Sequence, residues 1–176
     1  TQIEYYWAYA NYEDSMNLVE ELIPYLFNKA GLDLKIETDE GTVDFTPPYP
    51  RKTMRALILE YAKVDIEEYP DKESMYEKVK ELHVKVEASD GRGKLIDELY
   101  KKFVRPHITN PLFMIDHPVD LSPLAKRKPE NPAYTERFQL LCVGGNELCN
   151  AFSELNDPLD QEERFREQDR LVQGGD

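Results

Sequence analysis

The sequence lacks the features that would point to a membrane, to secretion or to a generally basic nucleic-acid surface. No apolar run reaches the roughly 18 residues that a membrane-spanning helix needs, and residues 1–4 have no signal-peptide layout. Positive charge is scarce, because 22 Lys and Arg stand against 35 Asp and Glu, a formal net charge of −13. This balance argues against a uniformly basic surface, although a local basic patch would still allow tRNA binding.

The chain also lacks the cysteine and histidine patterns of disulfide frameworks and metal centres. Its two cysteines, Cys142 and Cys149, have a spacing that fits neither, so we expect reduced, partly buried thiols in a cytoplasmic protein. The histidines His83, His107 and His117 show no ligand-like mutual spacing. No Ser-His-Asp or Cys-His arrangement stands out, so the sequence offers no protein nucleophile and no catalytic residue of its own.

What the sequence does contain is a strand that carries polar groups where a strand normally carries apolar ones. Between residues 146 and 158, the alternation of a strand places Asn150, Phe152 and Glu154 on one face, with about 7 Å between alternate residues. A carboxylate pairs with an ammonium group and an aromatic ring packs on methylenes, so this face suits a cationic ligand with an apolar stem. An edge strand with one solvent-exposed face explains the same pattern, and both interpretations stay open.

Hydrophobic periodicity predicts strands joined by hairpins, with helices in separate blocks. A helix follows the capping residue Asn11 and stops at Gly31, and a last charged helix starts at Asp157-Pro158. The expected strands are residues 3–10, 35–38, 42–46, 112–116, 138–143 and the polar strand already described. At 176 residues, this order predicts one domain with an antiparallel α+β architecture.

The middle of the chain differs in character. Residues 53–108 show charged helical patterns with thin apolar stripes, so we expect a small helical insertion that lies outside the sheet and covers an edge. Residues 1–52 and 109–176 would then be parts of one domain. The run Gly91-Arg92-Gly93-Lys94 lacks the length and the ending of a phosphate loop, and a turn at a helix start explains it better.

Three blocks, in order and with similar spacing, resemble class II lysyl-tRNA synthetases. Residues 1–14, TQIEYYWAYANYED, resemble the strand and helix start that follow the family's second class-defining motif. Residues 116–127, DHPVDLSPLAKR, resemble its Pro-x-x-x-Ser-Pro-Leu-Ala-basic stretch, and residues 147–158, with the run FSELND, resemble its lysine-binding strand. The resemblance covers essentially the whole chain, and three blocks in register are specific where one short motif is weak.

The resemblance implies an α+β fold built on the antiparallel sheet of the class II aminoacyl-tRNA synthetase catalytic core. It implies a lysine–tRNA ligase that uses ATP and Mg²⁺, acts on lysine and tRNA(Lys), and forms a homodimer at full length. The chain matches the region between the second and third class motifs. The motif arginines, the dimer helix and the anticodon-binding barrel fall outside it, so we expect a fragment that is not a competent catalyst alone.

The resemblance also implies the residues of a lysine pocket. Glu4 matches the family position at the substrate amino group and Tyr6 the position near the side chain, while Asn150, Phe152 and Glu154 complete the pocket. A lysine substrate has two ammonium groups and one aliphatic stem, which calls for two acids and an aromatic wall. We therefore expect these five side chains to converge on one pocket.

Glu147 matches the family acid that helps to hold Mg²⁺ against the ATP phosphates. Its odd separation from Glu154 predicts that the two carboxylates lie on opposite faces of the strand. The family's second metal acid falls at Gln139, where an amide replaces it, and the spacing from Gln139 to Glu147 is one residue longer than usual. This spacing predicts a bulge around Gly144-Gly145 and leaves the number of metal sites open.

Two other functions fit the same residues. One is a paralogue that activates lysine or β-lysine and transfers it to a protein side chain. The other is a non-catalytic lysine-binding module. The intact run FSELND favours the tRNA enzyme over the first. Glu147 argues against the second, because a lysine sensor needs no acid for metal and ATP.

Overall fold

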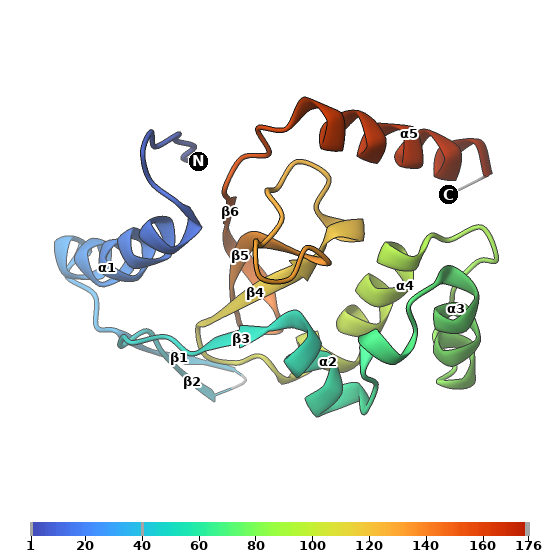
Figure 1. The fold of residues 1–176 in the computed structure, drawn as a ribbon. Helices are drawn as coiled ribbons and strands as arrows, with labels where there is room; N and C mark the ends of the chain where they lie inside the picture. The colour runs from blue at the N-terminus through green and yellow to red at the C-terminus, as the bar shows by residue number, and fades with distance from the viewer. Residues whose placement is uncertain (1, 40, 175–176) are drawn as a thin grey trace.

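A four-stranded sheet lies between one long helix and a group of shorter helices in the computed structural model, which describes residues 2–39 and 41–174 (Figure 1). The strand order is β3-β4-β5-β6: β3 is Arg51–Thr53, β4 Leu112–Pro118, β5 Tyr134–Cys142 and β6 Asn146–Phe152. The last three pair antiparallel, and β3 joins β4 in parallel. The predicted α+β class is confirmed, and the parallel strand is an addition that the sequence did not indicate.

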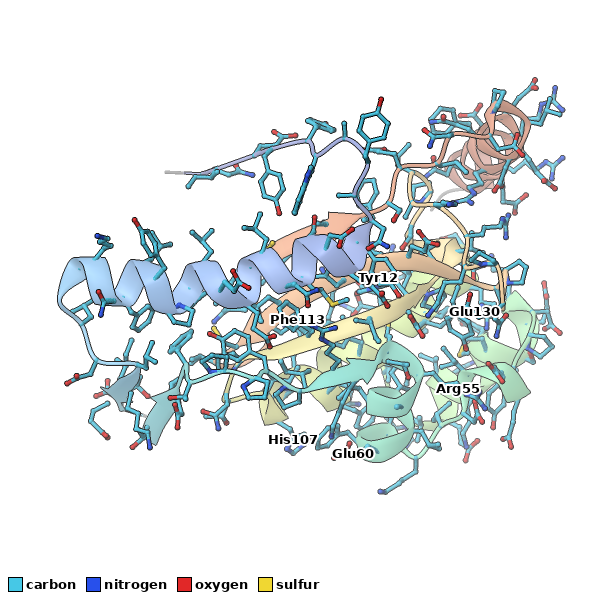
Figure 2. All side chains as sticks on the ribbon, turned by 60° about the vertical axis from the view of Figure 1, so that its left-hand side comes forward. Tyr12, Arg55, Glu60, His107, Phe113 and Glu130 are labelled. Atoms are coloured by element: carbon cyan, nitrogen blue, oxygen red, sulfur yellow. The ribbon has the colours of Figure 1, made fainter. Side chains whose placement is uncertain are left out.

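The first layer is α1 (Tyr12–Ala30), whose ends follow the predicted signals. Asn11 Oδ1 accepts hydrogen bonds from the backbone N–H groups of Glu13 and Asp14, which closes a capping box. Gly31 ends the helix with a φ of 69°, a conformation that favours glycine. The inner face of α1 packs on the sheet, where Tyr12 and Phe113 lie between helix and strand (Figure 2).

A small hairpin follows α1, as the sequence predicted. Its strands are β1 (Lys35–Thr38) and β2 (Gly41–Asp44), paired antiparallel. Val43 and Phe45 bury against Cys142 at the end of β5. Cys142 is buried and Cys149 is half-buried, and both thiols are free. The hairpin thus closes one end of the main sheet.

The second layer is formed by the helices and helical turns of residues 54–108. It contains α2 (Met54–Ala62), α3 (Lys72–Glu81), α4 (Arg92–Leu99) and the short helical turns η1 (Ile66–Glu68), η2 (Tyr100–Val104) and η3 (Arg105–His107). No strand occurs between residues 54 and 108, all of which the structure describes. That residues 53–108 are an insertion between residues 1–52 and 109–176 stays a prediction.

The expectation that these helices cover only an edge, outside the main core, is wrong. Their apolar side chains form the largest buried cluster of the described residues, and Met114 and Leu141 of the sheet belong to it. Each stripe is thin by itself, but the stripes of α2, α3 and α4 face one another and one face of the sheet. Several narrow stripes therefore add up to one core.

The predicted strand at residues 3–10 is also wrong. Residues 2–10 have no strand assignment, and Ile3 and Tyr6 are each 80% exposed. Aromatic and β-branched residues favour a strand only where a neighbouring strand pairs with them. In the part of the chain that the structure describes, this segment has no such partner.

The last helix, α5 (Pro158–Gly174), crosses beyond the end of β6 (Figure 1). A buried arginine fixes it: Arg164 Nη1 donates to the carbonyl oxygens of Ser122 (3.0 Å) and Ala125 (2.7 Å). Arg164 also pairs with Asp160, which accepts from Arg127 as well. None of the described helices is both long and apolar enough to cross a membrane.

Replacing Asp160 should detach α5. Asp160→Ala leaves the nearly buried Arg164 without its carboxylate, and the free energy of opening of α5 should fall by about 3 kcal/mol. Hydrogen exchange of the α5 amides measures this. Glu162→Ala is the control, because the pair of Glu162 with Arg166 is exposed and should contribute little. Equal exchange in the two variants would contradict the role of Arg164.

The same contact should depend on pH. Hydrogen bonds from Arg164 and Arg127 hold the pKa of Asp160 well below its usual range. A lowered folded-state pKa gives stability that is present above the unfolded value, about 4, and is lost as the pH falls through the folded value. Protection of α5 should therefore decrease in acid, and Asp160→Ala should remove that dependence.

Candidate functional site

The site is built on the β5–β6 hairpin, whose turn is irregular. Val143, Gly144 and Gly145 all have positive φ and connect the pair Cys142↔Asn146. The strands then pair regularly to Leu141↔Glu147, and the next pair is Leu140↔Cys149. Leu148 is therefore an extra residue in β6. The bulge that the spacing predicted at Gly144-Gly145 lies instead at Leu148.

This bulge decides which side chains share a face. Cys149 and Ala151 pack with Phe138 and Leu140 against α1. Their strand neighbours Asn150 and Phe152 point to the other face, toward α2 and α4. Because Leu148 is extra, Glu147 pairs with Leu141 and also lies on that second face, where Gln139 Nε2 donates to its carboxylate.

The prediction that Glu147 and Glu154 occupy opposite faces is therefore wrong. Ser153 Oγ accepts from the backbone N–H of Tyr12 on the α1 side, so alternation puts Glu154 on the face of Phe152 and Asn150. The odd separation of Glu147 from Glu154 was counted on a regular strand, and one extra residue reverses the parity.

A pocket of about 210 Å³ opens between this face and the helices. Its lining comes from the strands, from the helices of residues 54–108 and from the segment after β4: Met54, Asp97, Tyr100, Met114, His117, Leu121, Arg137 and Gln139. Burial raises the pKa of Tyr100 to about 12, and the charges of Asp97 and Glu147 act in the same direction. The pocket is thus polar at the strands, where His117, Arg137 and Gln139 lie, and mixed at the helices, where Asp97 stands beside Met54 and Tyr100.

Arg137 connects the pocket to the predicted lysine face. Its Nε donates to Asn150 Oδ1 at 3.0 Å. Its Nη1 donates to the carbonyl oxygen of Leu121 at 2.9 Å and to Ser122 Oγ at 3.0 Å. One planar guanidinium therefore fixes both the amide of Asn150 and the loop of residues 121–122.

His117 is a buried polar residue of the pocket lining. It is 2% exposed, and its Nε2 lies 3.0 Å from Gln139 Oε1. Burial, together with the positive charge of Arg137, lowers the pKa of His117 to about 3. The ring is therefore neutral at neutral pH.

The predicted lysine residues come together only in part. The hydroxyl of Tyr6 donates to Glu4 Oε1 at 3.3 Å, and both side chains are exposed. Glu4, and to a smaller degree Glu154, raise the pKa of Tyr6. In the described part of the chain, this electrostatic effect links the N-terminal pair to the end of β6. The convergence of all five side chains with Asn150 and Phe152 stays a prediction.

Sequence reasoning gave no role to Arg137, His117, Asp97 or Tyr100. Arg137 and Gln139 alternate with apolar residues on β5, which is a signal for a polar face that sequence analysis passed over. Asp97 and Tyr100 come from the helical segment, where a charged and an aromatic residue on an amphipathic helix carry no distinctive signal.

The comparison with known proteins identifies the family. The family model described as tRNA synthetases class II (D, K and N) matches residues 1–173. This chain belongs to the class II tRNA synthetases. The resemblance of its three sequence blocks is thereby confirmed.

Several curated relatives of this class II synthetase chain are named lysine–tRNA ligase. The protein of Thermotoga maritima is 48% identical over 176 residues, which cover 100% of this chain and 34% of the relative. The protein of Dehalococcoides mccartyi (strain CBDB1) is 45% identical over 168 residues, covering 96% and 34%. That of Chloroflexus aurantiacus is 43% identical over 176 residues, covering 100% and 36%. The chain spans about a third of the length of these relatives.

Whether this class II synthetase chain could hold a metal ion depends on how many carboxylates it places close together. The described residues contain no group of three or more His, Cys, Asp or Glu side chains that could hold a metal ion. Mg²⁺ bound to a nucleotide needs only one or two protein carboxylates, because phosphate and water oxygens complete its shell. Glu147 is exposed near the β5–β6 turn, so this single carboxylate fits such an ion.

Arg137 should matter for stability as well as for the site. Arg137→Met keeps much of the volume and removes the donors to Leu121, Ser122 and Asn150. The free energy of unfolding in urea should fall by about 2 kcal/mol, because hydrogen bonds to a charged group contribute more than neutral ones. Arg51→Met is the control, since that guanidinium bonds Asn17 at the surface. An unchanged value would mean that burial of the guanidinium costs as much as its hydrogen bonds contribute.

Proposed function

We propose that the protein carrying this chain is a lysine–tRNA ligase, which activates lysine with ATP and transfers it to tRNA(Lys). The carrying observation is the intact face of Asn150, Phe152 and Glu154 in a chain that is 43–48% identical to proteins of that name. The partners follow from this function: lysine, ATP with Mg²⁺, and tRNA(Lys), in a cytoplasmic homodimer.

The lysine pocket in this proposal spans the two ends of the chain. Glu154 receives the side-chain ammonium and Glu4 the α-ammonium, while Tyr6 and Phe152 flank the aliphatic stem. Two facts support it: Glu154 influences the ionisation of Tyr6, and Arg137 holds Asn150 in place on the same face as Phe152. An ammonium group that leaves water needs a carboxylate partner, and an aromatic wall lowers the cost further.

The nucleotide in this proposal lies toward the hairpin end of β6. Glu147 and Glu154 share one face but stand at opposite ends of the strand, roughly 20 Å apart along an extended chain. Lysine and nucleotide therefore bind at the two ends of the strand and not on its two faces. When bound, Mg²⁺ neutralises phosphate charge, and Glu147 contributes the protein carboxylate that positions it.

Activation of lysine needs no protein nucleophile, because the substrate carboxylate attacks the α-phosphorus of ATP. This chain then contributes positioning and charge complementarity: Glu154 and Glu4 hold the two ammonium groups, and Arg137 orients Asn150 beside the substrate. The aromatic side chains exclude water from the stem. The rest of the catalytic machinery lies outside this chain in the proposal.

Two substitutions on β6 separate the roles. In the whole protein, Glu154→Gln should lower kcat/KM for lysine in pyrophosphate exchange by roughly 10³-fold, because loss of a paired charge costs about 4 kcal/mol. The loss should appear mainly in the KM for lysine, with the KM for ATP nearly unchanged. Glu147→Gln should weaken the use of Mg²⁺ and ATP while lysine affinity stays near wild type.

The control is Glu136→Gln, a carboxylate of β5 that alternates onto the α1 face with Phe138. Identical kinetic signatures for Glu154→Gln and Glu147→Gln would contradict the division along the strand. Lysine activation without charging of tRNA(Lys) would favour the paralogue that modifies a protein. Lysine binding without ATP turnover in the whole protein would favour a binding module.

A further inference from the structure

His117 reaches the pocket through an irregularity in β4. The pairing of β4 with β5 shifts register between Ile115 and His117, and Asp116 at the shift has a φ of 56°. Ile115 packs toward α1, whereas His117 lines the pocket with Met114 on the other side. The backbone of His117 is fixed as well, because Thr135 Oγ1 donates to its carbonyl oxygen at 3.0 Å.

The hydrogen bonds from Glu147 through Gln139 to His117 determine which group donates and which accepts at each step. The carboxylate of Glu147 only accepts, so the side-chain amide of Gln139 must turn its NH₂ group toward it. Gln139 Oε1 then faces His117, and Nε2 of that ring must carry the proton that it donates. Nδ1 is left as a bare acceptor, and it is the buried side-chain atom of the described residues that has no hydrogen-bond partner.

We propose that His117 and Gln139 are positioning residues for Glu147. The Nε2–H of His117 holds the amide of Gln139, and that amide holds one carboxylate oxygen of Glu147. Gln139 is consequently not a metal ligand, since its NH₂ group faces Glu147 and its carbonyl oxygen faces His117 instead of that carboxylate. A cation bound at this site would be held by a single protein carboxylate, that of Glu147.

This arrangement explains how the chain tolerates an amide at Gln139. Two carboxylates side by side repel each other unless a cation lies between them. The amide replaces that repulsion by a donor–acceptor pair, so Glu147 keeps its orientation before any cation arrives. Residues that orient a metal ligand typically contribute tenfold or more, on the order of 10–100-fold, to metal affinity.

We call the hydrogen bonds from His117 to Gln139 and from Gln139 to Glu147 the relay. The first test detects the relay in protein that contains no metal. In protein labelled with ¹⁵N-histidine, the signal of His117 is assigned by its loss in His117→Leu. Wild type should show the Nε2–H tautomer alone. Glu147→Gln should give a mixture, because an amide at that position can donate or accept and frees Gln139 to turn. Glu136→Gln should leave the tautomer unchanged. An Nδ1–H tautomer in wild type, or one that Glu147→Gln does not alter, would overturn the proposal.

The second test measures Mn²⁺ binding in the presence of ATP, by the signal of free Mn²⁺ in electron paramagnetic resonance. His117→Leu should weaken Mn²⁺ binding by about tenfold, and His117→Gln, which restores a donor near the position of Nε2, should stay close to wild type. Circular dichroism checks that each variant folds. A folded His117→Leu protein with wild-type Mn²⁺ affinity would overturn the positioning role. If His117→Leu fails to fold, His117→Gln supplies the assignment of the His117 signal, and the tautomer measurement decides alone.

Only the effect of the relay on metal binding rests on the proposed function. The relay and the metal role of Glu147 can therefore be disproved separately. If Glu147→Gln changes the tautomer of His117 but leaves Mn²⁺ affinity unaltered, the metal role of Glu147 in the proposed function is wrong while the relay stands. If Glu147→Gln abolishes Mn²⁺ binding without changing the tautomer, the metal role stands and the relay is wrong.

Discussion

Two irregularities in the pairing of the central strands control the arrangement on which the rest of the site depends. Between Ile115 and His117, β5 has one residue more than β4, and Asp116 in β4 adopts a positive φ at this shift, whereas Leu148 is an extra residue in β6. Without these shifts, alternation would send His117 and Glu147 toward α1 and its apolar contacts. With them, both side chains reach Gln139 on the face of the pocket. β-Bulges often re-aim side chains next to functional sites, and here one lies on each side of β5, in its pairing with β4 and in its pairing with β6.

Packing on the two faces of the sheet follows different rules. The α1 face is a dry contact of aromatic and aliphatic side chains, in which Phe113 and Phe138 meet edge to face with centroids 5.4 Å apart. The opposite face is apolar only near Met114 and Leu141 and becomes polar toward β6. The helices of residues 54–108 bury the apolar part and leave the polar part open, which turns half of a sheet face into a pocket.

The sequence predicted the helices and strands themselves better than it predicted which of them pack or pair with one another. The helix after Asn11, the hairpin of β1 and β2 and the antiparallel strands follow from caps, turns and periodicity, which are local properties. The parallel pairing of β3, the missing strand at residues 3–10 and the shared core of the helices depend on contacts between distant segments. The family resemblance named Asn150, Phe152, Glu154 and Glu147. It could not place Arg137 or His117, because their roles arise from hydrogen bonds that no linear spacing encodes.

The single extra residue Leu148 decides on which face of β6 Glu147 lies relative to Glu154. Counting along a regular strand separates Glu147 from Glu154 by face, and that separation would give each ligand its own side of the sheet. Leu148 brings both acids to one face, so in the proposed function lysine and nucleotide divide the length of the strand instead. An amide between Glu147 and His117 is then useful, because two free carboxylates close to Asp97 would add negative charge to a pocket whose cation, Arg137, already serves Asn150 and the loop after β4. The substitution at Gln139 thus reduces the charge that the pocket must balance before a metal ion binds.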